Sequence, residues 1–245
     1  ADGFGLTEVH AYAFGFPIGT DQAINYIDNV AISNAEGNVA DPTTVEVVED
    51  DTPEAVELGD DSAMLADFQD EELFLGTDKD GLQIGYVTWG DADNVSIETV
   101  VAEGDLALPE QDDDNAVLQV TYDIGTFGGF THAFTDGEAW VPQDWNAFSS
   151  FNFWLYGANS ESVIQVEIFD NRNEDANSDS AERFAYQVVD DFEGWRFFSI
   201  PFGAFQRRFD WQPNGAPADG FGLNEVHGYS FGFPEHSWAS IELQG

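Results

Sequence analysis

Residues 150–156 read SFNFWLY, residues 162–169 read SVIQVEIF, and residues 183–189 read RFAYQVV. β-Branched and aromatic residues, which favour extended strands, dominate all three stretches. Alternate residues of a strand share one face, so Phe151, Phe153 and Leu155 form one set and Asn152, Trp154 and Tyr156 the other. Gly, Asn and Asp residues, which favour turns, separate the stretches. The pattern indicates consecutive short strands.

Similar stretches fill the rest of the chain from Met64 onward, and no apolar stripe with the 3.6-residue period of a helix interrupts them. They cover residues 82–89, 95–102, 116–123, 130–134, 195–200, 222–231 and 239–243. Many short strands at regular spacing predict an all-β fold, a two-sheet antiparallel β-sandwich of the jelly-roll type.

The two ends of the chain carry a repeat. Residues 1–17 read ADGFGLTEVHAYAFGFP and residues 218–234 read ADGFGLNEVHGYSFGFP; the differences are Thr7/Asn224, Ala11/Gly228 and Ala13/Ser230. The first copy can be the end of a preceding tandem module, a strand that completes this module, or a strand donated to a neighbouring chain. We therefore divide the chain into terminal strands (1–33), an acidic linker (34–62) and a sandwich module (63–245).

Composition excludes several classes of function. The chain has 48 acidic residues against 6 Lys and Arg, a formal net charge of −42. Binding to nucleic acid or to an anionic membrane surface needs clustered cations, which this chain lacks. An acid excess of this size repels itself unless salt or bound cations screen it, which favours a secreted protein, extracellular or at the cell surface, in a halophilic setting. The absence of Cys excludes disulfides and thiolate sites.

Several blocks of sequence resemble β-sandwich carbohydrate-binding modules of family 11 and their relatives. The blocks are residues 65–70 (LADFQD), 144–148 (DWNAF), 151–157 (FNFWLYG), 193–202 (EGWRFFSIPF) and 26–30 (YIDNV). The resemblance implies a jelly roll that often carries calcium and binds β-glucan or a similar polysaccharide on a concave sheet. It also implies a non-catalytic module that accompanies a secreted glycoside hydrolase.

Polysaccharides are recognised by flat aromatic faces together with polar groups that bond the hydroxyls. The residues predicted to line such a face are Trp89, Trp140, Gln165, Arg183, Tyr186, His227 and Tyr229. The alternative is that these side chains pack in the core or under loops. Catalysis is not expected: acidic pairs are unavoidable in this composition, and no Gly-x-Ser-x-Gly or His-Glu-x-x-His motif occurs.

Calcium is the candidate cofactor, because hard cations prefer carboxylate and amide oxygens. The loop after residue 169 offers Asn173, Asp175, Asn177 and Asp179 at alternate positions, and the resemblance adds Asp67 and Asp70. The spacing does not match an EF-hand loop.

Two functional hypotheses remain open at this point. The first is a polysaccharide-binding module of a larger extracellular protein. The second is a structural repeat of an extracellular array or filament, which assembles by strand donation through the terminal repeat.

Overall fold

A computed structural model gives the fold and describes residues 23–33, 46–47, 62–69, 72–108, 115–173, 175–233 and 242–243. Within these residues the regular structure consists of strands and three short 3₁₀ turns, η2 (Ala92–Asn94), η3 (Gly104–Leu106) and η4 (Phe202–Ala204). No helix in the described part is long and apolar enough to cross a membrane.

The first sheet has eight strands in the order β2-β12-β9-β1-β7-β6, with β15 beside β9 and β3 beside β1. Its strands are β1 (Ala23–Ser33), β2 (Glu46–Val47), β3 (Ser62–Ala66), β6 (Val95–Val101), β7 (Ala116–Tyr122), β9 (Ser150–Ala158), β12 (Glu193–Pro201) and β15 (Glu242–Leu243). Every pairing in it is antiparallel.

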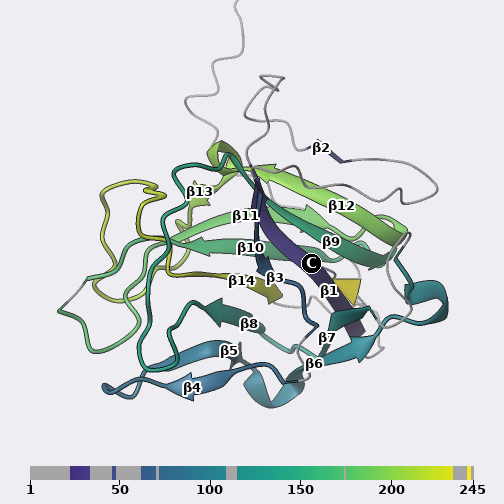
Figure 1. Cartoon of the computed structure of the whole chain (residues 1–245), viewed down its shortest axis with the longest axis horizontal. Helices are drawn as coiled ribbons and strands as arrows, with labels where there is room; N and C mark the ends of the chain where they lie inside the picture. The colour runs from purple at the N-terminus through teal and green to yellow at the C-terminus, as the bar shows by residue number, and fades with distance from the viewer. Residues whose placement is uncertain are drawn as a thin grey trace, which may run out of the picture.

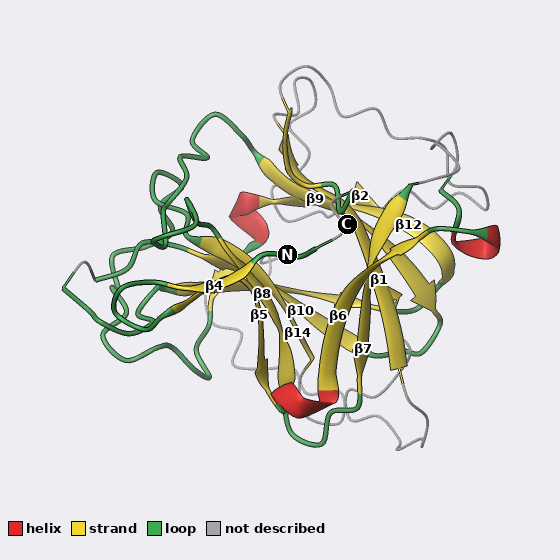
Figure 2. Ribbon diagram, turned by 60° about the horizontal axis from the view of Figure 1, so that its bottom comes forward, coloured by secondary structure: helices red, strands yellow, loops and turns green. Residues whose placement is uncertain are grey.

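The second sheet has seven strands in the order β13-β11-β10-β14-β8-β5-β4, also antiparallel throughout. Its strands are β4 (Leu75–Thr77), β5 (Gln83–Gly90), β8 (Gly128–Ala133), β10 (Val163–Phe169), β11 (Arg183–Val189), β13 (Gln206–Arg207) and β14 (Gly228–Phe233). Figures 1 and 2 show the two sheets facing one another, which confirms the predicted antiparallel β-sandwich.

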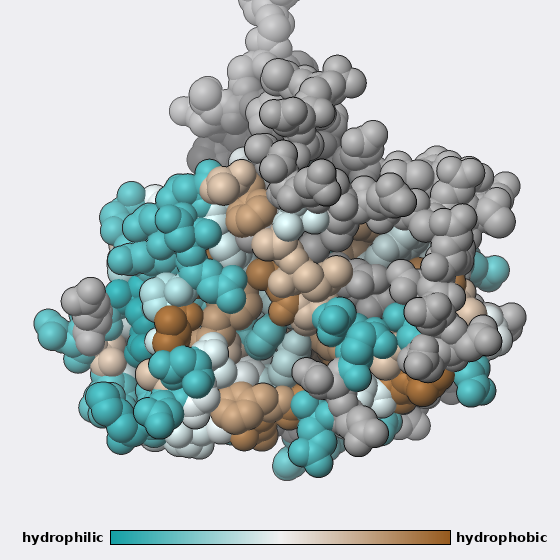
Figure 3. Space-filling model, in the orientation of Figure 1, coloured by the Kyte–Doolittle hydropathy of each residue, from teal (hydrophilic) through white to brown (hydrophobic). Residues whose placement is uncertain are grey.

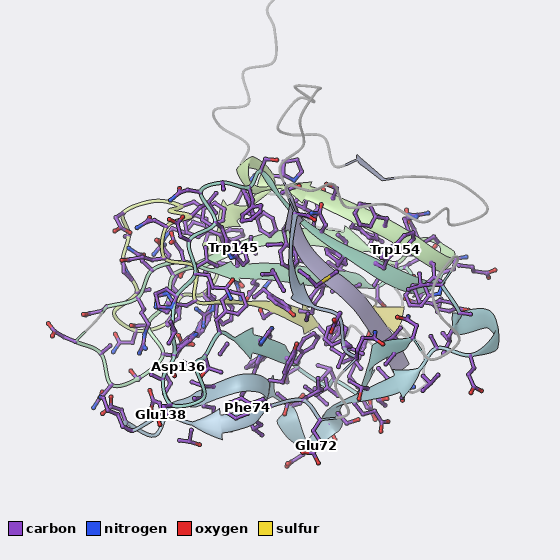
Figure 4. The ribbon with its side chains drawn as sticks, viewed as in Figure 1. Glu72, Phe74, Asp136, Glu138, Trp145 and Trp154 are labelled. Carbon is purple, nitrogen blue, oxygen red and sulfur yellow. The ribbon has the colours of Figure 1, made fainter. Side chains whose placement is uncertain are left out.

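One core fills the space between the sheets. Phe151, Phe153 and Leu155 of β9 meet Val166 and Ile168 of β10 there, as the alternation of both strands predicts. Trp145, labelled in Figure 4, is buried against Phe134, Phe151 and Phe202. Trp145, Phe151 and Phe202 come from three of the blocks that resemble the carbohydrate-binding modules.

The outer side of the eight-stranded sheet is also covered. Trp154 (Figure 4), Trp195 and Phe197 are buried there with Ala102 and Leu108 of the segment that follows β6. The indole Nε1 of Trp195 donates to the Leu106 carbonyl, 2.9 Å away, and fixes that segment. These aromatic rings are therefore used in packing, and the outer face of the other sheet is the better candidate for a ligand.

Some boundaries differ from the sequence prediction. The strand predicted at 222–231 is β14 at Gly228–Phe233, because residues 223–225 form a turn before it. Residues 23–33, assigned to the terminal strands, form β1 inside the eight-stranded sheet. Glu46–Val47 of the predicted linker form the edge strand β2. The first repeat copy, residues 1–17, lies outside the described residues.

Candidate binding face on the seven-stranded sheet

The outer face of the seven-stranded sheet carries aligned rows of side chains. Trp89, Gly129, Gly232, Gln165 and Gln187 are direct cross-strand partners, in that order, on β5, β8, β14, β10 and β11. The adjacent row on the same face runs through Val87, Thr131, Ser230, Glu167 and Ala185. Partners in such a row lie side by side, so each row crosses the sheet at right angles to the strands.

Trp89 begins the first row and lies against the sheet. A Cβ atom on Gly129 would come within 2.7 Å of the Trp89 Cζ2 atom, and one on Gly232 within 3.0 Å of its Cη2. The ring therefore rests on two residues that have no side chains. Its Nε1 donates to Thr131 Oγ1 at 3.0 Å, and the residue is half-buried. The ring is therefore held against the sheet in a fixed orientation.

Polar side chains follow Trp89 across the sheet and converge on Glu167, which is 2% exposed. Gln165 Nε2 donates to Glu167 Oε1 at 2.7 Å, and Arg208 Nη1 donates to the same oxygen at 2.6 Å. Ser230 Oγ donates to Glu167 Oε2 at 2.9 Å. A buried carboxylate with three donors orients its neighbours, because each donor loses a charge-assisted hydrogen bond if it moves.

Arg208 extends this network to the edge of the sheet. It also donates to Asp210 through Nε, 3.0 Å from Oδ1, and its guanidinium lies 5.5 Å from the ring centroid of Trp211. Trp211 is 50% exposed and Phe209 is 99% exposed. Sequence reasoning missed Arg208, Phe209 and Trp211, since they follow the two-residue strand β13 and show no alternation. The run of cations and aromatics in residues 207–211 (RRFDW) was the available signal.

Trp89 and Gln165 thus lie on the predicted face, in one row. Arg183 is on the same face but is 3% exposed, with its guanidinium 3.3 Å from the ring centroid of Phe169. It pairs with Asp179, and its Nη1 donates to the Ala181 carbonyl at 2.5 Å. Arg183 therefore anchors the loop before β11, and its charge is used within the protein.

Trp140 and His227 are brought together, but beneath a loop. Trp140 is buried with Ile84, Ala133 and Phe169, and its Nε1 donates to the His227 carbonyl. His227 Nδ1 lies 2.9 Å from the Glu225 carbonyl, and burial lowers the pKa of the imidazole to about 4. Contrary to the sequence prediction, both side chains are buried within the protein, and neither is exposed on the outer face of the seven-stranded sheet.

Tyr186 and Tyr229 point to the other side of the sheet, also contrary to prediction. Tyr229 is 0% exposed in the main core, where its ring contacts Phe151 and His132. Tyr186 is half-buried against the same core near Phe205. The reason is strand parity: Tyr229 shares its face with Phe231 and Phe233, and Tyr186 shares its face with Phe184 and Val188.

The predicted calcium ligands do not converge in the described part of the chain, where no three acidic or histidine side chains are placed to hold a metal. Asp179 is paired with Arg183, Asn173 Oδ1 accepts the Asp175 N–H at 3.1 Å, and Asp67 Oδ1 accepts the Gln69 N–H at 3.3 Å. The other predicted ligands are Asn177, which is exposed in the same loop, and Asp70, which lies outside the described residues.

Two buried oxygens beside this loop have no hydrogen-bond partner, Glu182 Oε2 and Asn171 Oδ1. Asp170 is adjacent, and burial raises the pKa of its carboxyl to about 6, with the charges of Glu182 and Asp219 adding to the rise. Figure 3 shows hydrophilic residues gathered on the side where the loops after β10 and β13 lie. Asp170, Asn171 and Glu182 are called the acidic corner below; the other oxygen of Glu182, Oε1, pairs with Arg207.

Comparison with known proteins gives the following matches. The sequence model of a family described as carbohydrate binding domain (family 11) matches residues 61–243. No curated protein sequence matches the chain significantly.

Among solved structures, a family 11 carbohydrate-binding module from Clostridium thermocellum, in complex with a beta-1,3-1,4-mixed-linked tetrasaccharide, is 19% identical with a TM-score of 0.48, covering 66% of this chain and 90% of that chain. The family 11 module of the cellulosomal cellulase Lic26A-Cel5E of the same organism is 18% identical with a TM-score of 0.46, covering 71% and 95%.

Proposed function

Because the chain belongs to the family 11 carbohydrate-binding domains, we propose that it binds a β-glucan-like polysaccharide along the outer face of the seven-stranded sheet. One observation carries this proposal: the Trp89 ring rests against Gly129 and Gly232, in line with the polar side chains around Glu167. Pyranose rings present C–H groups on their faces and hydroxyls at their edges, so they need such a pairing of flat apolar and polar surfaces.

The row from Trp89 to Gln187 sets the direction of the sugar chain. It crosses five strands, which places its ends about 19 Å apart at the usual strand spacing. One sugar ring stacks on Trp89, and the next rings lie over Gln165 and Gln187, whose amides can both donate to and accept from hydroxyls. Arg208, held by Glu167 and Asp210 at the edge of the sheet, supplies a further polar group.

Binding without catalysis is the role expected of the family. We propose that the domain keeps an attached glycoside hydrolase close to its substrate, which raises the local concentration of that substrate. An insoluble or very large ligand and the net charge of −42 both favour a secreted location, extracellular or at the cell surface, at high salt.

We propose calcium as a stabilising ion at the acidic corner formed by Asp170, Asn171 and Glu182. The support is the pair of buried oxygens that have no protein partner, since hard cations take oxygen ligands of this kind. Calcium should raise the melting temperature, EDTA should reverse the rise, and Glu182→Gln should abolish the response. An equal response in the wild type and the variant would place the ion elsewhere.

The binding proposal is tested by affinity electrophoresis in gels that contain mixed-linkage glucan, laminarin, xylan or soluble cellulose derivatives. The wild-type chain should be retarded by a glucan, and Trp89→Ala should lose most of that retardation while its melting temperature changes little. Val101→Ala is the matched control, because Val101 is an exposed apolar residue on the other sheet. Equal retardation of Trp89→Ala and wild type would refute the assignment of this face.

A further inference from the structure

The second copy of the terminal repeat supplies a central strand of the sandwich. Its residues 228–233 form β14, between β10 and β8. Tyr229, Phe231 and Phe233 of β14 fill the core. The first copy carries the same three aromatic residues at positions 12, 14 and 16, although it lies outside the described residues. The chain therefore encodes this strand twice.

The position of β14 between β10 and β8 suits the residues of the second copy better than those of the first. Where the first copy has Ala11, β14 has Gly228, and a Cβ there would come within 2.4 Å of the His132 carbonyl oxygen. Where the first copy has Ala13, β14 has Ser230, whose hydroxyl donates to Glu167. Two of the three differences between the copies thus favour the second copy in this place. The copies are not interchangeable within the seven-stranded sheet.

The strands that follow the two copies lead to the same place in the other sheet. β1 follows the first copy and pairs Ile27 with Leu155 of β9. β15 follows the second copy and pairs Leu243 with the same Leu155. The two strands contact each other, and Figure 1 shows β1 in purple and β15 in yellow beside β9. One edge of β9 therefore receives a strand from each end of the chain.

β1 is also the strand that joins the two halves of the eight-stranded sheet. It lies between β9 and β7, with Ala23–Ile27 paired to Leu118–Tyr122. Without it, β9 and β7 would each present an unpaired edge, and such edges recruit strands from other chains. Residues 34–45 join β1 to β2, and a segment of that length spans roughly 40 Å when extended, enough to reach a neighbouring molecule.

We propose that β1 is an exchangeable strand, and that a second copy of this chain can supply it in trans between β9 and β7. Two molecules then associate by reciprocal exchange of residues 23–33, with the same pairings as within one molecule. β15 of the same molecule already pairs with β9. The edge of β9 that β1 leaves is therefore still partly paired, which lowers the barrier to exchange. The partner is another molecule with the same repeat, as in a tandem or polymeric array.

The absence of Cys makes the exchange measurable in the full-length chain. Ile24 and Thr121 are cross-strand partners, and two Cys at such positions are within disulfide reach. Single variants Ile24→Cys and Thr121→Cys are unfolded and refolded together at high concentration, then oxidised. The matched control pairs Ile24→Cys with Thr77→Cys in place of Thr121→Cys. Thr77 is an exposed threonine on the other sheet. The 24–121 cross-link is identified by mass spectrometry of the peptides.

Exchange predicts a covalent dimer linked through 24–121, at about ten times the yield of the 24–77 control, since only register pairing brings the thiols within reach. Yields equal to the control would overturn the proposal. A second measurement needs no substitution: tagged and untagged wild-type chains are refolded together, and the untagged chain should be retained by the tag. If the untagged chain is lost in the wash at every concentration, strand exchange does not occur.

Discussion

Trp89 has its position because two of its neighbours have no side chains. Gly129 and Gly232 leave a flat stretch of backbone on β8 and β14, and the indole lies on it with its Nε1 bonded to Thr131. The rotamer is fixed by the sheet before any ligand arrives, so binding does not have to order the ring. Preorganisation of this one ring is the feature on which the proposed function depends most.

Gly232→Ala should weaken glucan binding while leaving stability nearly unchanged. The new Cβ would lie 3.0 Å from Trp89 Cη2 and would meet no other atom more closely than 3.5 Å, so the ring tilts away from the sheet and the backbone stays. Affinity electrophoresis and thermal unfolding of the same sample measure both effects. Gly125→Ala is the control, because its nearest neighbour is an Asp91 oxygen at 3.7 Å. Unchanged affinity in Gly232→Ala would show that glucan binding does not depend on how Trp89 rests against the sheet.

His227 makes a specific prediction for acid stability. Burial lowers its pKa from 6.5 to about 4, so between these values the unfolded chain takes up a proton that the folded chain refuses. The free energy of unfolding then falls as the pH falls through this range, by up to about 1.4 kcal/mol per pH unit for one group. His227→Gln removes this loss. Urea unfolding at pH 7, 5.5 and 4 should show that the free energy of unfolding declines less steeply for the variant than for the wild type. Equal declines would show that His227 does not titrate with a lowered pKa.

At the level of the strands, the sequence predicts which face of the sheet a residue occupies wherever the two alternating sets of residues differ in polarity. Ile164, Val166 and Ile168 alternate with Gln165 and Glu167, and the structure places the two sets on opposite faces. In β14 the signal was also present, because Tyr229 has Phe231 and Phe233 at a period of two. The sequence prediction assigns Tyr229 to the ligand face because flat aromatic rings recognise sugars, whereas its parity indicates the core.

Other parts of the site depend on contacts that no alternation along a single strand reveals. Trp140 is buried by contacts with Phe169 and Ala181, which are remote in sequence. Arg208 reaches Glu167 only because β13 pairs with β11 and places the following residues at the edge of the sheet. Contacts of this kind depend on which strands pair in the tertiary structure, and the periodicity of the sequence does not reveal them.

Gly228→Ala should destabilise the protein, because β14 lies between two strands and cannot move away from the His132 carbonyl, 2.4 Å from the new Cβ. We expect a loss of about 1–3 kcal/mol in the free energy of unfolding, as for other overpacked sites. Chemical denaturation measures it, again with Gly125→Ala as the control. A loss no greater than that of the control would show that the place of β14 accepts the alanine of the first copy.

At the level of the whole molecule, the cations are engaged within the protein. Lys79, Arg183, Arg196, Arg207 and Arg208 all pair with acidic side chains, and Arg172 donates to backbone carbonyls and lies over Trp140. The acidic residues outnumber them 48 to 6. The excess negative charge is therefore balanced by ions from the solvent, and stability should depend on their concentration.

The melting temperature should rise steadily as NaCl is raised from low concentration to about 2 M, because screening weakens repulsion among the carboxylates. Differential scanning calorimetry measures the change, and sucrose at matched osmolality separates screening from general exclusion of solutes. A melting temperature that is flat in NaCl but rises with sucrose would show that the acid excess is not a stability determinant.

The most direct test of the proposed function follows the seven tryptophan indole N–H signals by NMR during titration with a mixed-linkage glucan oligosaccharide. The Trp89 signal is identified by its absence in Trp89→Phe. If glucan binds the outer face of the seven-stranded sheet, this signal shifts most, while those of Trp154 and Trp195, buried on the opposite sheet, stay in place. A titration that shifts the Trp154 and Trp195 signals and leaves Trp89 unchanged would place the ligand on the other sheet and refute the proposed function.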